Sequence, residues 1–293
     1  MTKMIEGLEG LYDALGHYDK VFMIHDEAVG EFADAIAGRA DIGATLSICA
    51  SSECKTIDSV MLICRFLLEF GADRDALVLA VGGGTTLDMV GFAAAIYKRG
   101  VRCAYVPTTV LSQVDAAIGG KTGVNLDGFK NILGTFTMPE FVCTCSEPLK
   151  TLPHRDFVSG FAELLKTFVI ADSGLYRKAV ELLPEASETH PESIAGLIAA
   201  AAGIKSAIVA RDPFEKGERR ALNLGHTFAH AVEWFEQTHD VENPMTHGEA
   251  VAAGIVAAAE LSEKAGVAGT GLAARLARDF AACGLPTEIP YDM

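Results

Sequence analysis

The stretch ALVLAVGGGTTLDMVGFAAA, residues 76–95, decides the fold class. Its first six residues are apolar on both faces of an extended chain, which is typical of a strand buried inside a parallel sheet. Gly82, Gly83 and Gly84 follow directly, and the residues after them have helical spacing. A strand, a glycine turn and a helix in this order indicate a βα unit, whose turn lets the backbone and the helix dipole approach an anion such as a pyrophosphate.

The glycine turn departs from the usual dinucleotide fingerprint. Leu87 stands where the third glycine of a GxGxxG motif would be, so a tight turn that binds nothing is the alternative. Asp26 ends the apolar run VFMIHD, where doubly wound folds hold an adenosine ribose. Turn or N-cap chemistry is the other interpretation of this aspartate.

Short apolar runs alternate with helix-like segments along the first half of the chain. After a helix-like start (Ile5, Leu8, Leu11, Leu15), the expected strands are 21–26, 44–50, 76–81, 103–107 and 141–145, and the expected helices are 56–70 and 85–97. From about residue 153 no convincing strand follows, and the expected helices are 155–170, 174–183, 191–210, 221–235, 248–265 and 271–283. The sequence therefore predicts an α/β domain with a parallel sheet at 1–152 and an all-α domain at 153–293.

The charge of the chain limits its partners. Its 39 Asp and Glu outnumber its 24 Lys and Arg, for a formal net charge of −15, which argues against nucleic acid and anionic membranes. No uncharged apolar window reaches the roughly 18 residues of a membrane span, and the acidic start MTKMIEGLEG does not resemble a signal peptide. We expect a cytoplasmic protein whose seven cysteines are reduced thiols.

Two histidines, His226 and His230, lie four residues apart in ALNLGHTFAHAVEW, residues 221–234. In a helix both imidazoles leave one face a turn apart, a spacing that suits metal ligands, although a packed or exposed pair is more common. His247 starts another Ala-rich helix, and Glu163 lies inside a third. A carboxylate and two or three imidazoles on converging helices would form a site of the kind that catalytic Zn²⁺ occupies.

The segment PTTVLSQVDAAIGGKTGVNLDGFKNILG, residues 107–134, is too polar and glycine-rich to be only a helix. Glycines beside lysines let a backbone fold around an anion, and a solvated loop is the alternative. The polar residues in question are Asp115, Lys121, Asn125, Lys130 and Asn131. Lys166, Lys205 and Arg219 lie near the helical motifs, so these cations together suggest a pocket for a ligand with more than one negative group.

These motifs as a set resemble the 3-dehydroquinate synthase family of sugar phosphate cyclases. The resemblance rests on GGGTTLDMVGFAAAIYKRG, VPTTVLSQVDAAIGGKTGVN, KNILG, LKTLPHRDFVSGFAELLK, RRALNLGHTFAHA and HGEAVAAGI, across roughly residues 77–260. It implies a Rossmann-like domain that binds NAD, a helical domain with a divalent metal (Zn²⁺ or Co²⁺), and a homodimer. The family's GExxK motif is one residue short here, as Glu53, Cys54 and Lys55, and its C-terminal DKK-like segment would lie beyond the final IPYDM.

The resemblance also implies roles for individual residues. The metal ligands would be Glu163, His226 and His247, so that His230 would contact substrate, phosphate or a proton in transfer instead. The catalytic residues would be Lys121, Lys166, Asn131, His230 and Asp115. The substrate would be held by Arg99 of a neighbouring subunit and by Lys130, Lys205, Arg219 and Asn223. NAD would be bound by Asp26, Gly83, Gly84, Asp88, Thr108, Thr109, Lys121 and Lys130.

The implied reaction converts the seven-carbon keto acid phosphate DAHP into 3-dehydroquinate and phosphate. It would proceed by transient oxidation with NAD, elimination of phosphate, reduction and an intramolecular aldol closure. The alternatives are another cyclase of the fold, a metal-dependent polyol dehydrogenase, or an inactive relative. Lys205, Arg219 and Asn223 favour the keto acid, because cyclases of neutral sugars have no substrate carboxylate to pair with them.

Overall fold

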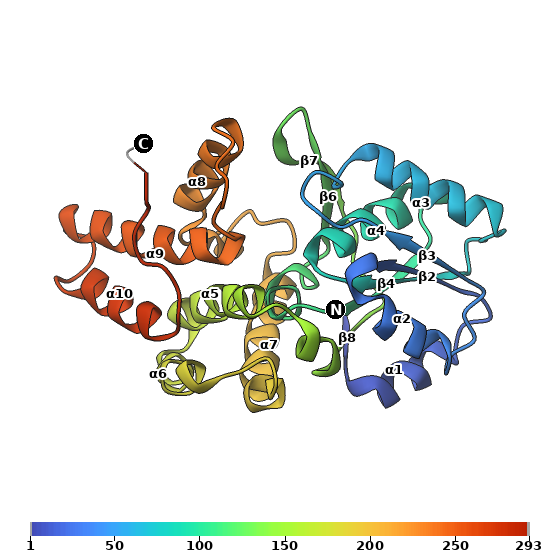
Figure 1. Cartoon of the computed structure of the whole chain (residues 1–293), viewed down its shortest axis with the longest axis horizontal. Coiled ribbons are helices and arrows are strands. Elements are labelled where there is room, and N and C mark those ends of the chain that lie inside the picture. Colours follow the sequence, from blue (N-terminus) through green and yellow to red (C-terminus); the bar gives the residue numbers. More distant parts are fainter. Residues whose placement is uncertain (1, 292–293) are drawn as a thin grey trace. The chain divides into compact units, whose positions relative to one another are not determined.

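The computed structural model describes residues 2–291. The chain divides into two compact units, Met1–Lys150 and Thr151–Met293, coloured blue to green and yellow-green to red in Figure 1.

The first unit is built on a six-stranded parallel sheet with the strand order β1-β8-β5-β4-β2-β3. Its strands are β1 (Lys3–Glu6), β2 (Val21–Asp26), β3 (Ala44–Ile48), β4 (Leu77–Gly82), β5 (Arg102–Pro107) and β8 (Phe141–Thr144). Its helices are α1 (Gly7–Leu15), α2 (Gly30–Ala37), α3 (Ile57–Glu69) and α4 (Gly84–Ile96). Phe22 and Ile24 pack with α3 and α4, while Val21 and Met23 pack with α1 and α2. Helices therefore cover both faces of the sheet, and the predicted α/β class is confirmed.

Strand β1 differs from the expected helical start. Ile5 lies in this strand and pairs with Cys143 of β8, and α1 begins only at Gly7. Among the four residues of β1 only Ile5 is buried. A strand this short at the edge of a sheet leaves no alternating pattern, so its single buried residue fits a helical period equally well.

A hairpin replaces part of the expected loop at 107–134. Strands β6 (Lys121–Leu126) and β7 (Phe129–Phe136) pair antiparallel across the two-residue turn Asp127-Gly128. Both turn residues have positive φ, 49° and 82°, as the tightest hairpin turns require. The Asp-Gly pair is the sequence signal of such a turn, but the other glycines of this segment make it look like part of an irregular loop.

The described part of the second unit contains helices and no strand, so the all-α prediction is confirmed for these residues. The helices are α5 (His154–Ala171), α6 (Ser173–Leu182), α7 (Ala195–Arg211), α8 (His226–Thr238), α9 (His247–Lys264) and α10 (Leu272–Ala282). Helix α9 packs against α5, α8 and α10, and α7 packs against α5. The core of this unit therefore lies around α5 and α9.

One apolar segment, Pro191–Arg211, is long enough by composition to cross a membrane, the only such helix within residues 2–291. It contains α7, whose Leu197, Ile198 and Ala201 are buried within the unit. The core helix of a folded domain satisfies the same criterion, so the segment is weak evidence for a membrane span.

The expectation that all seven cysteines are reduced is wrong for two of them. Cys49 and Cys54 are joined by a disulfide across the turn that follows β3, because this turn brings their Cα atoms to 6.0 Å. Cys64, Cys103, Cys143, Cys145 and Cys283 are free. Burial raises the pKa of Cys103 and of Cys143 to about 12, so both behave as inert core thiols.

Candidate metal and cofactor sites

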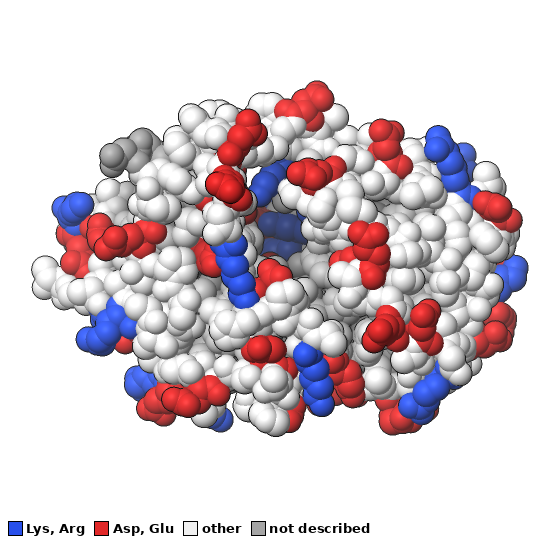
Figure 2. Space-filling view, viewed as in Figure 1, with Lys and Arg blue, Asp and Glu red and all other residues white. Residues whose placement is uncertain are grey.

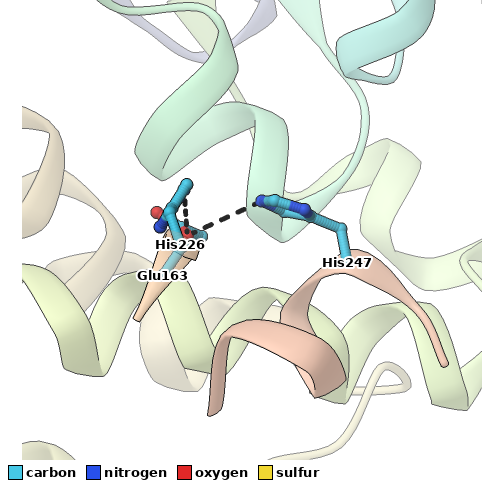
Figure 3. Close-up of side chains that lie close together, drawn as sticks. All are labelled: Glu163, His226 and His247. Carbon is cyan, nitrogen blue, oxygen red and sulfur yellow. Dashed lines mark ion pairs between the residues drawn. The ribbon is translucent and has the colours of Figure 1, made fainter. Parts of the chain in front are cut away.

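Three helices of the second unit bring Glu163, His226 and His247 together (Figure 3). Glu163 lies in the middle of α5, whereas the two histidines are the first residues of α8 and α9. Nε2 of His226 is 3.6 Å and Nε2 of His247 is 3.9 Å from Oε1 of Glu163. One ligand atom from each residue lies within 4.8 Å of the others. One carboxylate and two imidazoles are a donor set of catalytic zinc sites, so Zn²⁺ or Co²⁺ fits these residues.

The start of α8 depends on Gly225. This glycine has φ 80°, a left-handed conformation that separates the 3₁₀ turn Glu218–Asn223 from the helix. A Cβ at Gly225 would lie 2.6 Å from Cγ1 and 2.9 Å from the backbone N of Ile255 in α9. Glycine is therefore needed for α8 to approach α9, and His226 begins a helix instead of lying inside one that starts at 221.

The two candidate ligands present the same nitrogen to Glu163. Nδ1 of His226 lies 3.3 Å from the carbonyl oxygen of Leu224, and Nδ1 of His247 lies 3.0 Å from Oε1 of Glu233. A proton on each Nδ1 leaves the Nε2 lone pair available to a metal. The ring of His230 lies 5.6 Å from that of His226 and is outside the group of three.

Lys166 lies one helical turn after Glu163. Its Nζ is 2.5 Å from Oε2 of Glu163, and both side chains are 1% exposed. The carboxylate therefore contacts a buried cation through one oxygen and faces the histidines with the other. Each charge of this pair offsets part of the cost of burying the other.

Two further cations of this unit are buried, and one of them, Arg219, lies beside a glutamate that the sequence did not mark. Lys205 and Arg219 are 7% and 2% exposed, in contrast to the interspersed surface charges of Figure 2. Oε2 of Glu215 lies 3.9 Å from Nε of Arg219, and its Oε1 accepts a 2.5 Å hydrogen bond from Asn223. Glu215 thus joins two residues expected to hold substrate. Its location in a turn with φ 57° leaves no periodic pattern that could have marked it.

In the first unit, the glycine turn joins β4 to α4 as expected. Gly82 ends β4, Gly83 is the N-cap, and Gly84 opens α4. A Cβ at Gly84 would lie 3.0 Å from Cβ of Ala116, so a side chain would crowd the turn. Thr108 donates its backbone N–H to the oxygen of Gly82 at 3.0 Å. The first N–H groups of a helix have no intrahelical acceptor, and this turn therefore suits a pyrophosphate.

Asp26 makes the N-cap contact that was one of its two interpretations. Its Oδ1 accepts a 3.0 Å hydrogen bond from the backbone N of Ala28 at the start of a short 3₁₀ turn. This bond leaves lone pairs on the carboxylate, so the ribose contact stays a prediction.

Lys55 connects two of the expected site residues. Its Nζ lies 2.5 Å from Oδ2 of Asp88 on α4 and 2.6 Å from Oδ1 of Asn131 on β7. Lys55 belongs to the shortened GExxK motif, and its residue is only 9% exposed. The first unit therefore gathers Asp88, Asn131 and Lys55 into one hydrogen-bonded group.

Other expected residues of this unit lie on the hairpin and on two turns. Lys121 and Lys130 are exposed on the hairpin, and Asp115 lies in the π-helical turn Ser112–Ala116. Arg99 is exposed with φ 68°, between Lys98 and Gly100, which also have positive φ.

A clamp holds the start of α9 beside His247. The guanidinium of Arg155 donates to both carboxylate oxygens of Glu249 at 2.9 and 2.7 Å. Glu249 also accepts from the backbone N of Thr246 at 2.7 Å, as part of a capping box. Burial pushes the pKa of Glu249 upward, but Arg155 and the Thr246 amide outweigh it, and the pKa lies below its ordinary value.

Stability is expected to depend on pH through this clamp. A carboxyl with a lowered folded-state pKa stabilises the fold above its unfolded pKa, and this contribution is lost as the pH falls through the folded value. Arg155→Met should lower the free energy of unfolding at pH 7 by about 1 kcal/mol, since Arg155 is partly exposed. The deficit should shrink below about pH 4. Urea unfolding at pH 7 and below about pH 4 measures this deficit. Arg177→Met, at an exposed position, is the control. A deficit that persists unchanged in acid would contradict the role of the clamp.

Solved structures share this two-unit fold. ValA, the 2-epi-5-epi-valiolone synthase of Streptomyces hygroscopicus subsp. jinggangensis 5008, solved with NAD⁺ and Zn²⁺ bound, aligns with a TM-score of 0.86 at 26% identity, over 99% of this chain and 82% of its own. A 2-deoxy-scyllo-inosose synthase complexed with carbaglucose-6-phosphate, NAD⁺ and Co²⁺ aligns with the same TM-score and identity, over 99% and 80%. By its fold the chain therefore falls in the class of the sugar phosphate cyclases.

Sequence comparison narrows the class to one family. Residues 45–159 match the family described as 3-dehydroquinate synthase N-terminal, and residues 160–293 match 3-dehydroquinate synthase C-terminal. The 3-dehydroquinate synthase of Xanthomonas campestris pv. campestris strain 8004 is 41% identical over 266 residues, which cover 90% of this chain and 72% of that protein. The chain belongs to the 3-dehydroquinate synthase family.

Proposed function

We propose that this chain catalyses the 3-dehydroquinate synthase reaction, in which DAHP is converted into 3-dehydroquinate and phosphate. The observation that carries the proposal is the convergence of Glu163, His226 and His247 in a chain of this family. NAD supplies a transient hydride acceptor, and a divalent cation, Zn²⁺ or Co²⁺, lowers the pKa of the substrate hydroxyl that is oxidised. We assign NAD binding to residues 1–152 and metal and substrate binding to residues 153–293.

Buried cations support an acidic substrate. Arg219 and Asn223 both contact Glu215 in this structure, so a substrate carboxylate would take the place of the Glu215 carboxylate. The planar guanidinium of Arg219 matches a carboxylate in two-point geometry, and Asn223 would add an amide donor. Lys205 is held at 7% exposure, so its ammonium acts on a bound anion with little screening by water. A keto acid phosphate carries the two negative groups that such a set of donors can bind.

The remaining assignments concern cofactor binding and proton handling. We assign NAD contacts to Asp26, Gly83, Gly84, Asp88, Thr108, Thr109, Lys121 and Lys130. Phosphate binding and proton transfer are assigned to Lys121, Asn131, Asp115, Lys166 and His230, and substrate binding also to Lys130. Orientation of the reacting ends contributes on the order of 7 to 11 kcal/mol in well-aligned cases, so few dedicated acids and bases are required. We also propose a cytoplasmic homodimer in which Arg99 reaches the site of the second copy.

The assay of this proposal follows two products. With DAHP, NAD⁺ and Zn²⁺, the protein should release one phosphate for each 3-dehydroquinate, and omission of NAD⁺ or addition of a chelator should stop both. Because the hydride returns to the product, NADH should not accumulate. Accumulation of NADH with glycerol, without phosphate release from DAHP, would instead support a polyol dehydrogenase. Binding of metal with neither reaction would support an inactive relative.

A further inference from the structure

His247 lies between two carboxylates. Its Nε2 faces Oε1 of Glu163 at 3.9 Å, and its Nδ1 lies 3.0 Å from Oε1 of Glu233. Glu233 is on α8, seven residues after His226, and therefore on the same face of that helix two turns on. Its side chain is 8% exposed. Helix α8 thus supplies one candidate ligand directly and a buried carboxylate to the other.

We propose that Glu233 is a positioning residue that orients His247 for metal binding. A neutral imidazole has one N–H and one lone pair, and an ionised carboxylate can only accept a hydrogen bond. Glu233 therefore keeps the proton on Nδ1 and leaves the Nε2 lone pair directed toward Glu163. The accepted bond also makes the imidazole a stronger electron donor to a cation. The inference rests on the metal-binding part of the proposed function.

The other candidate ligand is oriented differently. Nδ1 of His226 faces the backbone oxygen of Leu224 at 3.3 Å, within the turn that leads into α8. The side chain of His226 is 14% exposed, whereas that of His247 is 34% exposed. Arg155 and Thr246 fix the backbone at the start of α9 but do not contact the ring in any described bond. The bond to Glu233 thus restrains the more exposed of the two rings, together with the ring of His226, whose centroid lies 5.4 Å away.

Metal affinity tests the proposal without turnover. Metal-free protein is titrated with Co²⁺ by calorimetry, and the visible absorption of the bound Co²⁺ is recorded. Loss of a carboxylate partner of a ligating histidine typically weakens binding 10- to 100-fold, and we expect about this loss for Glu233→Ala. Glu233→Gln should lose less, because its amide oxygen still accepts from Nδ1. Glu260→Gln, the same change at an exposed position of α9, should bind like the parent.

The tautomer of His247 in the metal-free protein separates positioning from a general effect on the fold. Nitrogen NMR of the parent should show the ring proton of His247 on Nδ1, and Glu233→Ala should lose that preference while the His226 ring keeps its own. An unchanged His247 tautomer in Glu233→Ala overturns the proposal, as does parent-like Co²⁺ affinity in that variant. If Glu233→Ala does not fold, Glu233→Leu, which fills a similar volume without an acceptor, takes its place in both measurements. A parent protein that binds Co²⁺ but does not convert DAHP would refute the proposed reaction and leave this inference standing.

Discussion

His226→Ala is expected to abolish both metal binding and turnover. The change removes one of three converging candidate ligands and leaves Glu163 and His247, which cannot enclose a cation from three sides. Metal affinity should fall by more than the roughly 10- to 100-fold loss typical of an outer partner. A metal contributes several kcal/mol of charge stabilisation, so turnover should fall on the order of a thousandfold or more.

Metal analysis of the purified variant, with phosphate release from DAHP, checks this expectation. His190→Ala is the matched control, because His190 is an exposed histidine of the same unit and lies outside the three-residue group. It should retain the metal content and rate of the parent. Undiminished metal in His226→Ala would contradict the assignment of this ligand.

The parallel sheet could be predicted because its central strands carry their own signature. Residues 77–82 are buried on both faces, and the glycines that follow mark the turn into α4. The edge of the sheet could not be predicted in the same way. In β1 a single buried residue, Ile5, holds the strand, and its partner Cys143 is distant in the chain. A contact of this kind is set by the tertiary fold and leaves almost no local pattern.

The sequence pattern was equally limited in predicting which residues make up the candidate metal site. Helical spacing pairs His226 with His230, but the structure groups His226 with His247 and Glu163. Spacing within one helix reports only which side chains share a face. The approach of α9 to α5 decides which histidine completes the group, and only the family resemblance carried that information at the sequence level.

Partners of site residues were the hardest to predict. Glu233 resembles any other glutamate of an amphipathic helix, and its contact with His247 depends on how α8 meets α9. Lys55 lies in an altered motif, so its contacts with Asp88 and Asn131 were not expected. Single charged residues have no periodicity of their own, and their role appears only once neighbouring elements are packed.

Gly248→Ala is expected to destabilise the second unit and weaken metal binding together. A Cβ at Gly248 would lie 1.9 Å from the backbone oxygen of Ser159 in α5, a contact that only a shift of the helices can relieve. The shift would also disturb the hydrogen bond from the Gly248 N–H to Oγ of Ser159. Because the obstacle is backbone, we expect a loss of about 3 kcal/mol in the free energy of unfolding. His247 is carried by α9 and Glu163 by α5, so Co²⁺ affinity should fall as well.

The control for this substitution is the same change where space is available. Gly203 lies on the exposed face of α7, and a Cβ there meets nothing within 4 Å. Gly203→Ala should therefore stabilise the protein by about 0.5 to 1 kcal/mol, because alanine is the better helix former, and leave Co²⁺ affinity unchanged. Urea unfolding and Co²⁺ titration of both variants compare the two sites. Parent-like stability and Co²⁺ affinity in Gly248→Ala would show that the close crossing of α5 and α9 does not hold the candidate ligands in place.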